Sequence, residues 1–231
     1  MTTFVLVHGA WGGSYGFRTL RRLLAAAGHE ALAPSLTGLG ERSHLTGPHV
    51  DLSLHVRDVV NAVRYEDLDG IVLLGFSYGG MVVTGALEQI GVRVRELVYL
   101  DAFVPDDGDS VASLTGGALG GGSDELGAPW SVPALPREFD DPAVAAWSNP
   151  RRHAQPLRTL TEPVRVSVPV EQRALGRTYI RATADLNGAL FDASAARART
   201  SPAWRYHEIA TGHMVPENRP AELAELLLAR S

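Results

Sequence analysis

Short apolar runs alternate with helical patterns along the first hundred residues. Uninterrupted apolar or aromatic runs are typical of strands covered on both faces, and they occur at 4–7, 71–74 and 97–100, with a weaker run at 31–33. Apolar residues at helical spacing predict helices over 17–27, 53–63 and 81–90. Gly28 is expected to end the first helix and Ser53 to cap the second. This alternation indicates parallel strands joined by right-handed crossovers.

The pattern is interrupted between Pro105 and about Leu175. Five glycines lie at positions 116–122, and ten of the 14 prolines fall between Pro105 and Pro202. An insertion of this length in a compact domain is usually functional, so we interpret residues 105–175 as a cap with short helices. Trp130 and Trp147 are its expected apolar anchors. A disordered loop is the alternative.

The strand pattern resumes after the insertion. Residues 178–182 and 204–209 are strand-like, and a last helix is expected to begin at Pro220. The predicted architecture is therefore α/β, with a mostly parallel central sheet, helices on both faces and an inserted cap. Residues 1–104 and 176–231 would form the core.

Composition restricts the chemistry available to this chain. The 231 residues include no cysteine and no lysine, so all 21 basic residues are arginine. Thiolate zinc sites, cysteine nucleophiles, Schiff bases and Ser-Lys pairs are thereby excluded. The net charge of −5 argues against nucleic acid or an anionic membrane as the main partner.

The start of the chain gives an expectation about location. No basic region followed by an apolar stretch precedes the strand at 4–7, and no apolar run approaches the length of a membrane helix. A cytoplasmic protein is expected. The oligomeric state stays open, a homo-oligomer included.

The motif Gly75-Phe76-Ser77-Tyr78-Gly79 follows a predicted strand directly and precedes a predicted helix. This G-x-S-x-G string in a strand–turn–helix context is typical of a nucleophile elbow, which holds a serine on a strained turn above the sheet. The Tyr78 N–H would then point to a developing oxyanion. The chain contains an expected nucleophile, Ser77.

A serine nucleophile needs a base, and the triad order for this architecture is serine, acid, histidine. His213 lies between the last strand and the last helix, and is the histidine best placed for that order. We favour Asp185 as the acid because it follows the strand beside that of His213. Asp101, at the end of an earlier strand, is the main alternative, and Asp192 is third.

The first strand leads into His8-Gly9-Ala10-Trp11-Gly12-Gly13. Such a turn can bring a second N–H, that of Ala10, to the oxyanion. A dinucleotide site is disfavoured, because the spacing lacks G-x-G-x-x-G and no acidic residue ends the next strand. His44, His49 and His55 lack a metal-binding pattern and are interpreted as part of a solvated loop. We therefore expect no cofactor and no metal.

Taken together, these segments resemble the α/β-hydrolase superfamily. The similarity is to the small esterase and hydroxynitrile-lyase branch, which includes plant methylesterases and bacterial relatives. It rests on VLVHGAW, GHEALAPSLTGLGERSH, GFSYGG, LVYLDAFVPDDG and TGHMVPENRPAELAELL, whereas the cap matches only loosely. The resemblance implies a triad of Ser77, Asp185 and His213, with the Ala10 and Tyr78 amides as the oxyanion hole.

Two positions separate lyases from esterases within this branch. The lyases carry a lysine directly after the catalytic histidine, where this chain has Met214, and a threonine where it has Gly9. Both differences imply a hydrolase of small apolar esters or lactones acting through an acyl-enzyme on Ser77. A lyase or eliminase using His213 as general base is the alternative, and a non-catalytic receptor is a third possibility. The pocket is expected to include Trp11, Phe103, Trp130, Trp147 and Met214.

Overall fold

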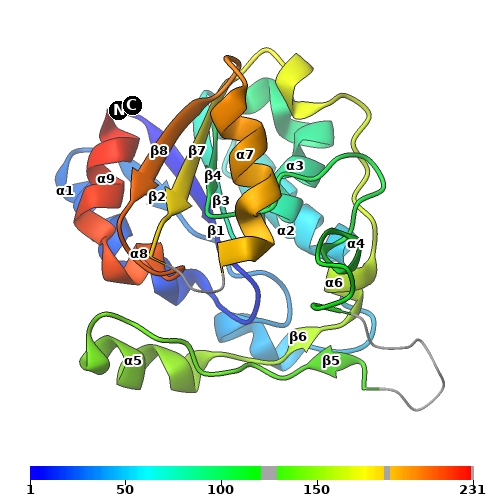
Figure 1. The fold of residues 1–231 in the computed structure, drawn as a ribbon. Coiled ribbons are helices and arrows are strands. Elements are labelled where there is room, and N and C mark those ends of the chain that lie inside the picture. Colours follow the sequence, from blue (N-terminus) through cyan, green and yellow to red (C-terminus); the bar gives the residue numbers. More distant parts are fainter. Residues whose placement is uncertain (121–128, 185–187, 230–231) are drawn as a thin grey trace.

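The protein is described here by a computed structural model that covers residues 1–120, 129–184 and 188–229. Its main sheet has six strands in the order β2-β1-β3-β4-β7-β8, and each neighbouring pair is parallel (Figure 1). The strands are β1 (Thr3–Val7), β2 (Glu30–Leu32), β3 (Ile71–Phe76), β4 (Val94–Leu100), β7 (Gly176–Ala182) and β8 (Arg205–Ile209). The expected α/β class with a parallel sheet is confirmed.

Alternating side chains of the strands enter two separate apolar layers. Leu6, Leu74 and Leu100 belong to one layer, which is covered by α1 (Arg18–Ala26) and α9 (Pro220–Leu228). Val7, Leu73 and Tyr99 belong to the other, which is covered by three helices. These are α2 (Leu52–Tyr65), α3 (Gly79–Ile90) and α7 (Asp192–Thr200), seen across the sheet from α1 and α9 in Figure 1. Burial on both faces explains the uninterrupted apolar runs of the strands.

The helix boundaries follow local signals, with one difference from expectation. Gly28 has φ of 83° and follows Ala27, the C-cap of α1, as glycine does at many helix ends. The N-cap of α2 is Asp51, whose side chain accepts a hydrogen bond from the Leu54 N–H. The expectation that Ser53 caps this helix is wrong. Ser53 instead donates from its N–H and hydroxyl to Glu162.

The chain between β4 and β7 forms short elements on the side of the sheet where the strands end. Figure 1 shows β5, β6 and α5 across the carboxyl ends of the strands, with α4 and α6 beside them. The elements are α4 (Val111–Leu114), β5 (Ser131–Val132), α5 (Pro142–Ser148), β6 (Gln155–Pro156) and α6 (Arg158–Thr161). β5 and β6 pair antiparallel. Ligands of open α/β sheets bind at this end of the strands, so the segment is positioned over the expected site.

Among the described residues, no helix combines the length and apolar character needed to cross a bilayer.

The approach of α3 to the chain after β4 gives a stability prediction. A Cβ at Gly80 would lie 2.1 Å from the Phe103 carbonyl oxygen, whereas a Cβ at Gly212 would meet nothing within 4 Å. Gly80→Ala is therefore expected to lower the free energy of unfolding by about 3 kcal/mol, despite the better helix propensity of alanine. Urea denaturation of this variant beside Gly212→Ala measures the difference. Equal stabilities of the two variants would contradict the predicted close approach.

Candidate active site

Ser77 occupies a strained turn between β3 and α3. Its φ is 56°, a left-handed value that is uncommon outside glycine. The Ser77 N–H donates to the Leu100 carbonyl oxygen at 3.1 Å, and the Ser77 carbonyl oxygen accepts from the Gly80 N–H at 3.1 Å. A Cβ at Gly79 would lie 2.6 Å from the Val7 carbonyl oxygen, so a larger residue does not fit there. This is the geometry expected of a nucleophile elbow.

His213 lies within hydrogen-bonding reach of the serine. Its Nε2 is 2.9 Å from Ser77 Oγ, and its Nδ1 is 2.7 Å from Asp101 Oδ2. A carboxylate only accepts, so Nδ1 carries the proton and Nε2 is free to accept from the serine hydroxyl. The imidazole also lies between two phenyl rings, with centroids 5.0 Å from Phe191 and 4.8 Å from Phe76. These contacts fix both the tautomer and the plane of the base.

The carboxylate of Asp101 is fully buried and accepts several hydrogen bonds. Oδ2 faces His213, whereas Oδ1 accepts from the Arg181 guanidinium at 2.7 Å and from the Ala182 N–H at 3.2 Å. The backbone at Asp101 is also left-handed, with φ of 41°. Two neighbouring strands thus contribute to this carboxylate: Asp101 directly follows β4, and the donors Arg181 and Ala182 belong to β7.

The partner of His213 is therefore Asp101, the alternative of the sequence analysis, where Asp185 had been favoured. Asp185 lies outside the described residues. The preference rested on β7 being the strand next to β8, whereas Asp101 follows β4, one strand further away. Neighbouring strands are only about 4.8 Å apart, so an aspartate and a histidine side chain together span one intervening strand. Asp192, the third candidate, pairs with Arg181.

Arg181 links these acidic groups. One guanidinium nitrogen contacts Asp101 and the other contacts Asp192, each at 2.7 Å. Burial disfavours the charged guanidinium, but the charge of Asp101 outweighs this effect and raises the pKa of Arg181. Arg181 is thus a positioning residue for the acid. The only sequence signal for this role is the position of Arg181 on a predicted strand, one residue before β7 ends.

The loop after β1 brings a second backbone donor close to the serine. Ala10 and Ser77 line the same two pockets, and Tyr78 lines one of them. In the described part of the chain, the Ala10 and Tyr78 N–H groups take no part in the hydrogen bonds of turns and loops. Both remain available to an oxyanion, as the sequence analysis expects.

Trp11 holds this loop against the segment between β4 and β7. Its φ is 60°, and its N–H donates to the buried Gln155 side chain at 2.8 Å. Its indole N–H donates to the Val132 carbonyl oxygen, and its own carbonyl oxygen accepts from the His153 N–H. Gln155 carries no sequence signal for this role, because its partner is 144 residues away.

Two buried histidines lie near the site: His55 contacts Tyr78 of the elbow, and His8 contacts the loop after β1. His8 accepts from the Leu36 N–H through Nε2, and His55 accepts from the Tyr78 hydroxyl through Nδ1 while donating to the Thr37 carbonyl oxygen. Burial lowers the pKa of each to about 4. The expectation that His55 belongs to a solvated loop is therefore wrong. His55 lies on the buried face of α2. Its position among the valines of this helix did not by itself predict that it is buried.

Two pockets meet at Ser77 and His213. One, about 480 Å³ including its opening, has polar side chains at its wall: Tyr15, Arg137, Arg152 and Glu217. The other, about 410 Å³ including its opening, is lined mainly by apolar side chains: Phe103, Val111, Leu119, Leu160, Leu190 and Phe191. Arg137 lines this pocket as well as the first. A reacting group at the serine thus has a polar space on one side and an apolar space on the other.

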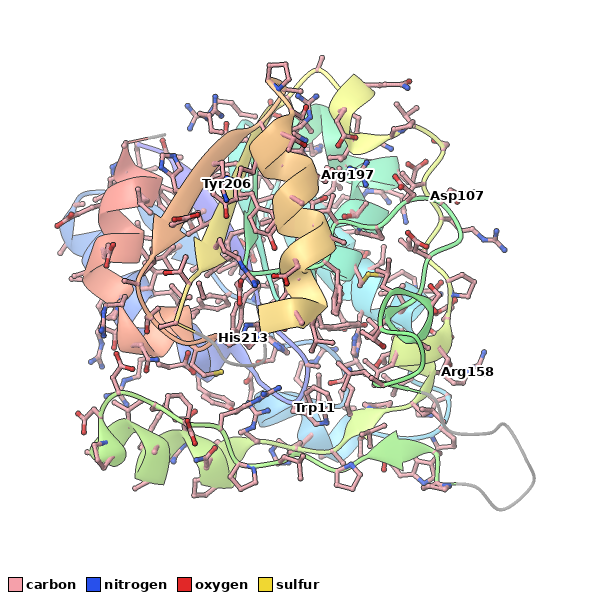
Figure 2. The ribbon with its side chains drawn as sticks, in the orientation of Figure 1. Trp11, Asp107, Arg158, Arg197, Tyr206 and His213 are labelled. Atoms are coloured by element: carbon pink, nitrogen blue, oxygen red, sulfur yellow. The ribbon has the colours of Figure 1, made fainter. Side chains whose placement is uncertain are left out.

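The expected pocket residues are divided between these spaces and the surface. Trp11 lines both pockets, Phe103 the apolar one and Met214 the polar one. Trp130 is not a lining residue of either and is 43% exposed. Trp147 is not one either, because its ring packs against Tyr15, Arg18 and Arg151. Figure 2 shows Trp11 and His213 between the sheet and the segment that carries β5, β6 and α5.

The sheet order, the elbow serine and its histidine and aspartate together define an α/β-hydrolase type of fold with a site of serine-nucleophile geometry. Residues 4–226 match the Alpha/beta hydrolase family. The chain belongs to this family.

Three similar proteins illustrate the relationship. The chain is 50% identical over 119 residues to a carbendazim hydrolyzing esterase of Nocardioides sp. (strain SG-4G), covering 52% of this chain and 49% of that protein. It is 35% identical over 107 residues to salicylic acid-binding protein 2 of Nicotiana tabacum, covering 45% and 40%. The crystal structure of an Arabidopsis methylesterase superposes with a TM-score of 0.79 at 24% identity, covering 100% and 98%. The chain thus spans about half the length, or less, of the curated relatives it matches, while the structural match extends over the whole fold.

The buried histidines predict how stability depends on pH. Both are neutral in the folded protein down to about pH 4, whereas in the unfolded chain they take up protons below their ordinary pKa of 6.5. The free energy of unfolding should therefore fall as the pH drops from about 6.5 to about 4, by about 3 kcal/mol for each histidine at the acidic end.

Urea denaturation across this interval measures the effect, and His55→Gln separates its source. Glutamine keeps a side-chain donor and acceptor but does not titrate, so the variant should lose stability less steeply than the wild type on acidification. Identical slopes for the two proteins would contradict the assignment of a neutral, buried His55.

Proposed function

We propose that this protein is a serine hydrolase that cleaves small carboxylic esters or lactones through an acyl-enzyme on Ser77. The observation that carries the proposal is the continuous hydrogen-bonded series from Ser77 Oγ through His213 to Asp101, at 2.9 and 2.7 Å. The esterase relatives support the same class of reaction. The segment between β4 and β7 is proposed to act as the cap over the substrate.

The proposed reaction begins with proton transfer. His213 Nε2 accepts the hydroxyl proton of Ser77 as Oγ attacks the ester carbonyl carbon. The Ala10 and Tyr78 N–H groups donate to the oxyanion, and Asp101 stabilises the imidazolium. His213 then donates its proton to the departing alcohol, leaving an acyl group on Ser77. Water, deprotonated by His213, attacks this acyl group. His213 then returns the proton to Ser77 Oγ as the bond between Oγ and the acyl carbon breaks, which releases the acid and restores the serine.

Chemical labelling tests the nucleophile. A fluorophosphonate probe should react with Ser77 in the folded wild type, identified by peptide mass, and should leave Ser77→Ala unlabelled. The same substitution should lower turnover of phenyl acetate by about 10⁴-fold or more. Absence of labelling in folded protein would overturn the proposal. Retention of activity on a substrate by Ser77→Ala would instead favour a lyase with His213 as general base.

A second prediction concerns the acid. Asp101→Asn should lower kcat by about 10³–10⁴-fold, since an amide in place of the carboxylate no longer holds the productive imidazole tautomer. Asp185→Asn is the matched control and should retain most of the activity, because the His213 Nδ1 proton is already donated to Asp101. Circular dichroism verifies that both variants are folded. A large loss confined to Asp185→Asn would contradict the assignment.

A further inference from the structure

The polar pocket beside Ser77 contains charged groups that the proposed reaction does not use. Arg137 and Arg152 both line it, and among the described residues neither guanidinium has a hydrogen-bond or ion-pair partner. The Arg152 Nε is moreover buried. A buried N–H without an acceptor is costly, so such a group usually has a ligand or water as its partner.

Glu217 lies in the wall of the same pocket. Its carboxyl group packs against Gly16, where an added Cβ would lie 3.0 Å from Oε1. Its Oε2 is buried and has no hydrogen-bond partner in the part of the chain that the structure describes. Burial raises the pKa of Glu217 to about 8, although the charge of Arg152 opposes this shift. Near neutral pH the group is therefore a neutral carboxylic acid, which can donate one hydrogen bond.

The other titratable groups around this pocket leave its charge positive. Burial keeps His8 neutral and raises the pKa of Tyr15 to about 12. Outside the pocket, Arg18 and Arg151 lie over the Trp147 ring, and Arg219 pairs with Asp140. His213 faces the serine. Two unpaired guanidinium groups and a neutral acid thus surround a space that opens directly onto the nucleophile.

We propose that this pocket binds a carboxylate, and that the protein prefers acidic esters, whose non-reacting part carries an ionised carboxyl group. Arg137 and Arg152 would supply charge-assisted donors, and Glu217 would donate a further hydrogen bond to the same anion. The apolar pocket on the other side of Ser77 would receive the uncharged part. This inference rests on the proposed ester hydrolysis and specifies its substrate class.

Matched substrates test the preference and locate the carboxylate. Monomethyl glutarate carries it in the acyl part and is compared with dimethyl glutarate; 4-acetoxybenzoate carries it in the alcohol part and is compared with phenyl acetate. In at least one pair, the KM of the acidic ester should be lower than that of its neutral counterpart by about tenfold or more. The pair that shows this difference identifies whether the carboxylate belongs to the acyl part or to the alcohol part. Equal KM values in both pairs, or higher ones for the acids, would overturn the proposal.

Adjacent arginines provide a matched control. Arg152→Gln should remove the advantage of the acidic ester, raising its KM toward that of its neutral counterpart. Arg151→Gln makes the same change of charge one residue away, at a side chain stacked on Trp147, and should retain the advantage. Equal losses in the two variants would indicate a general effect of charge and would contradict a specific site.

Glu217→Gln tests the neutral acid. The amide keeps a donor, so the preference for the acidic ester should persist at about pH 7. In the wild type the KM for the acidic ester should rise above about pH 8, where Glu217 ionises and repels the anion, and this rise should be absent in the variant. The KM for the neutral ester should not show it. A rise that persists in Glu217→Gln would contradict this role.

Binding without turnover separates this proposal from the proposed function. Glutarate is titrated into Ser77→Ala by calorimetry, and Arg152→Gln in that background should weaken its binding by about tenfold or more. If the wild type hydrolyses no ester but glutarate binds in this way, the hydrolase proposal fails and the carboxylate site stands. If phenyl acetate is hydrolysed at Ser77 but glutarate does not bind, the carboxylate site alone is refuted.

Discussion

The site depends on the burial of Asp101. A carboxylate removed from water requires hydrogen-bond donors, and the structure supplies them from the Arg181 guanidinium, the Ala182 N–H and His213 Nδ1. Meeting this requirement joins β4, β7 and the loop after β8 at one point. Because the imidazole is held by the same carboxylate, its Nε2 is aimed at Ser77, and the chemistry of the site follows from satisfying one buried charge.

Two left-handed residues at neighbouring strand ends bring Ser77 close to Asp101 and His213. Ser77 follows β3 and Asp101 follows β4, with φ values of 56° and 41°. They are tied together by the hydrogen bond from the Ser77 N–H to the Leu100 carbonyl oxygen. A strained backbone conformation persists only where the surrounding packing holds it in place. Here the two apolar layers and the close approach of Gly80 to the Phe103 carbonyl oxygen provide this packing.

The segment between β4 and β7 contributes differently on the two sides of the serine. On one side it provides apolar side chains such as Leu119 and Leu160, and on the other it provides Arg152, while Arg137 lines both pockets. Its hydrogen bonds to Trp11 attach it to the loop that carries the Ala10 N–H. The segment between β4 and β7 is therefore joined to this loop through Trp11, which lines both pockets.

The strands, the elbow serine and the histidine could be predicted from the sequence, because apolar periodicity and a motif between a strand and a helix are local signals. Ser77 Oγ and His213 Nε2 lie within hydrogen-bonding distance, which the roles predicted for them require. The choice of acid, the buried state of His55 and the unpartnered Arg152 could not be predicted. Each depends on groups that meet only after folding: Asp101 and His213 are 112 residues apart. The local sequence pattern determined the helices and strands. The tertiary structure decided which side chains are partners, because burial and the distance between residues far apart in the sequence are set only when the chain folds.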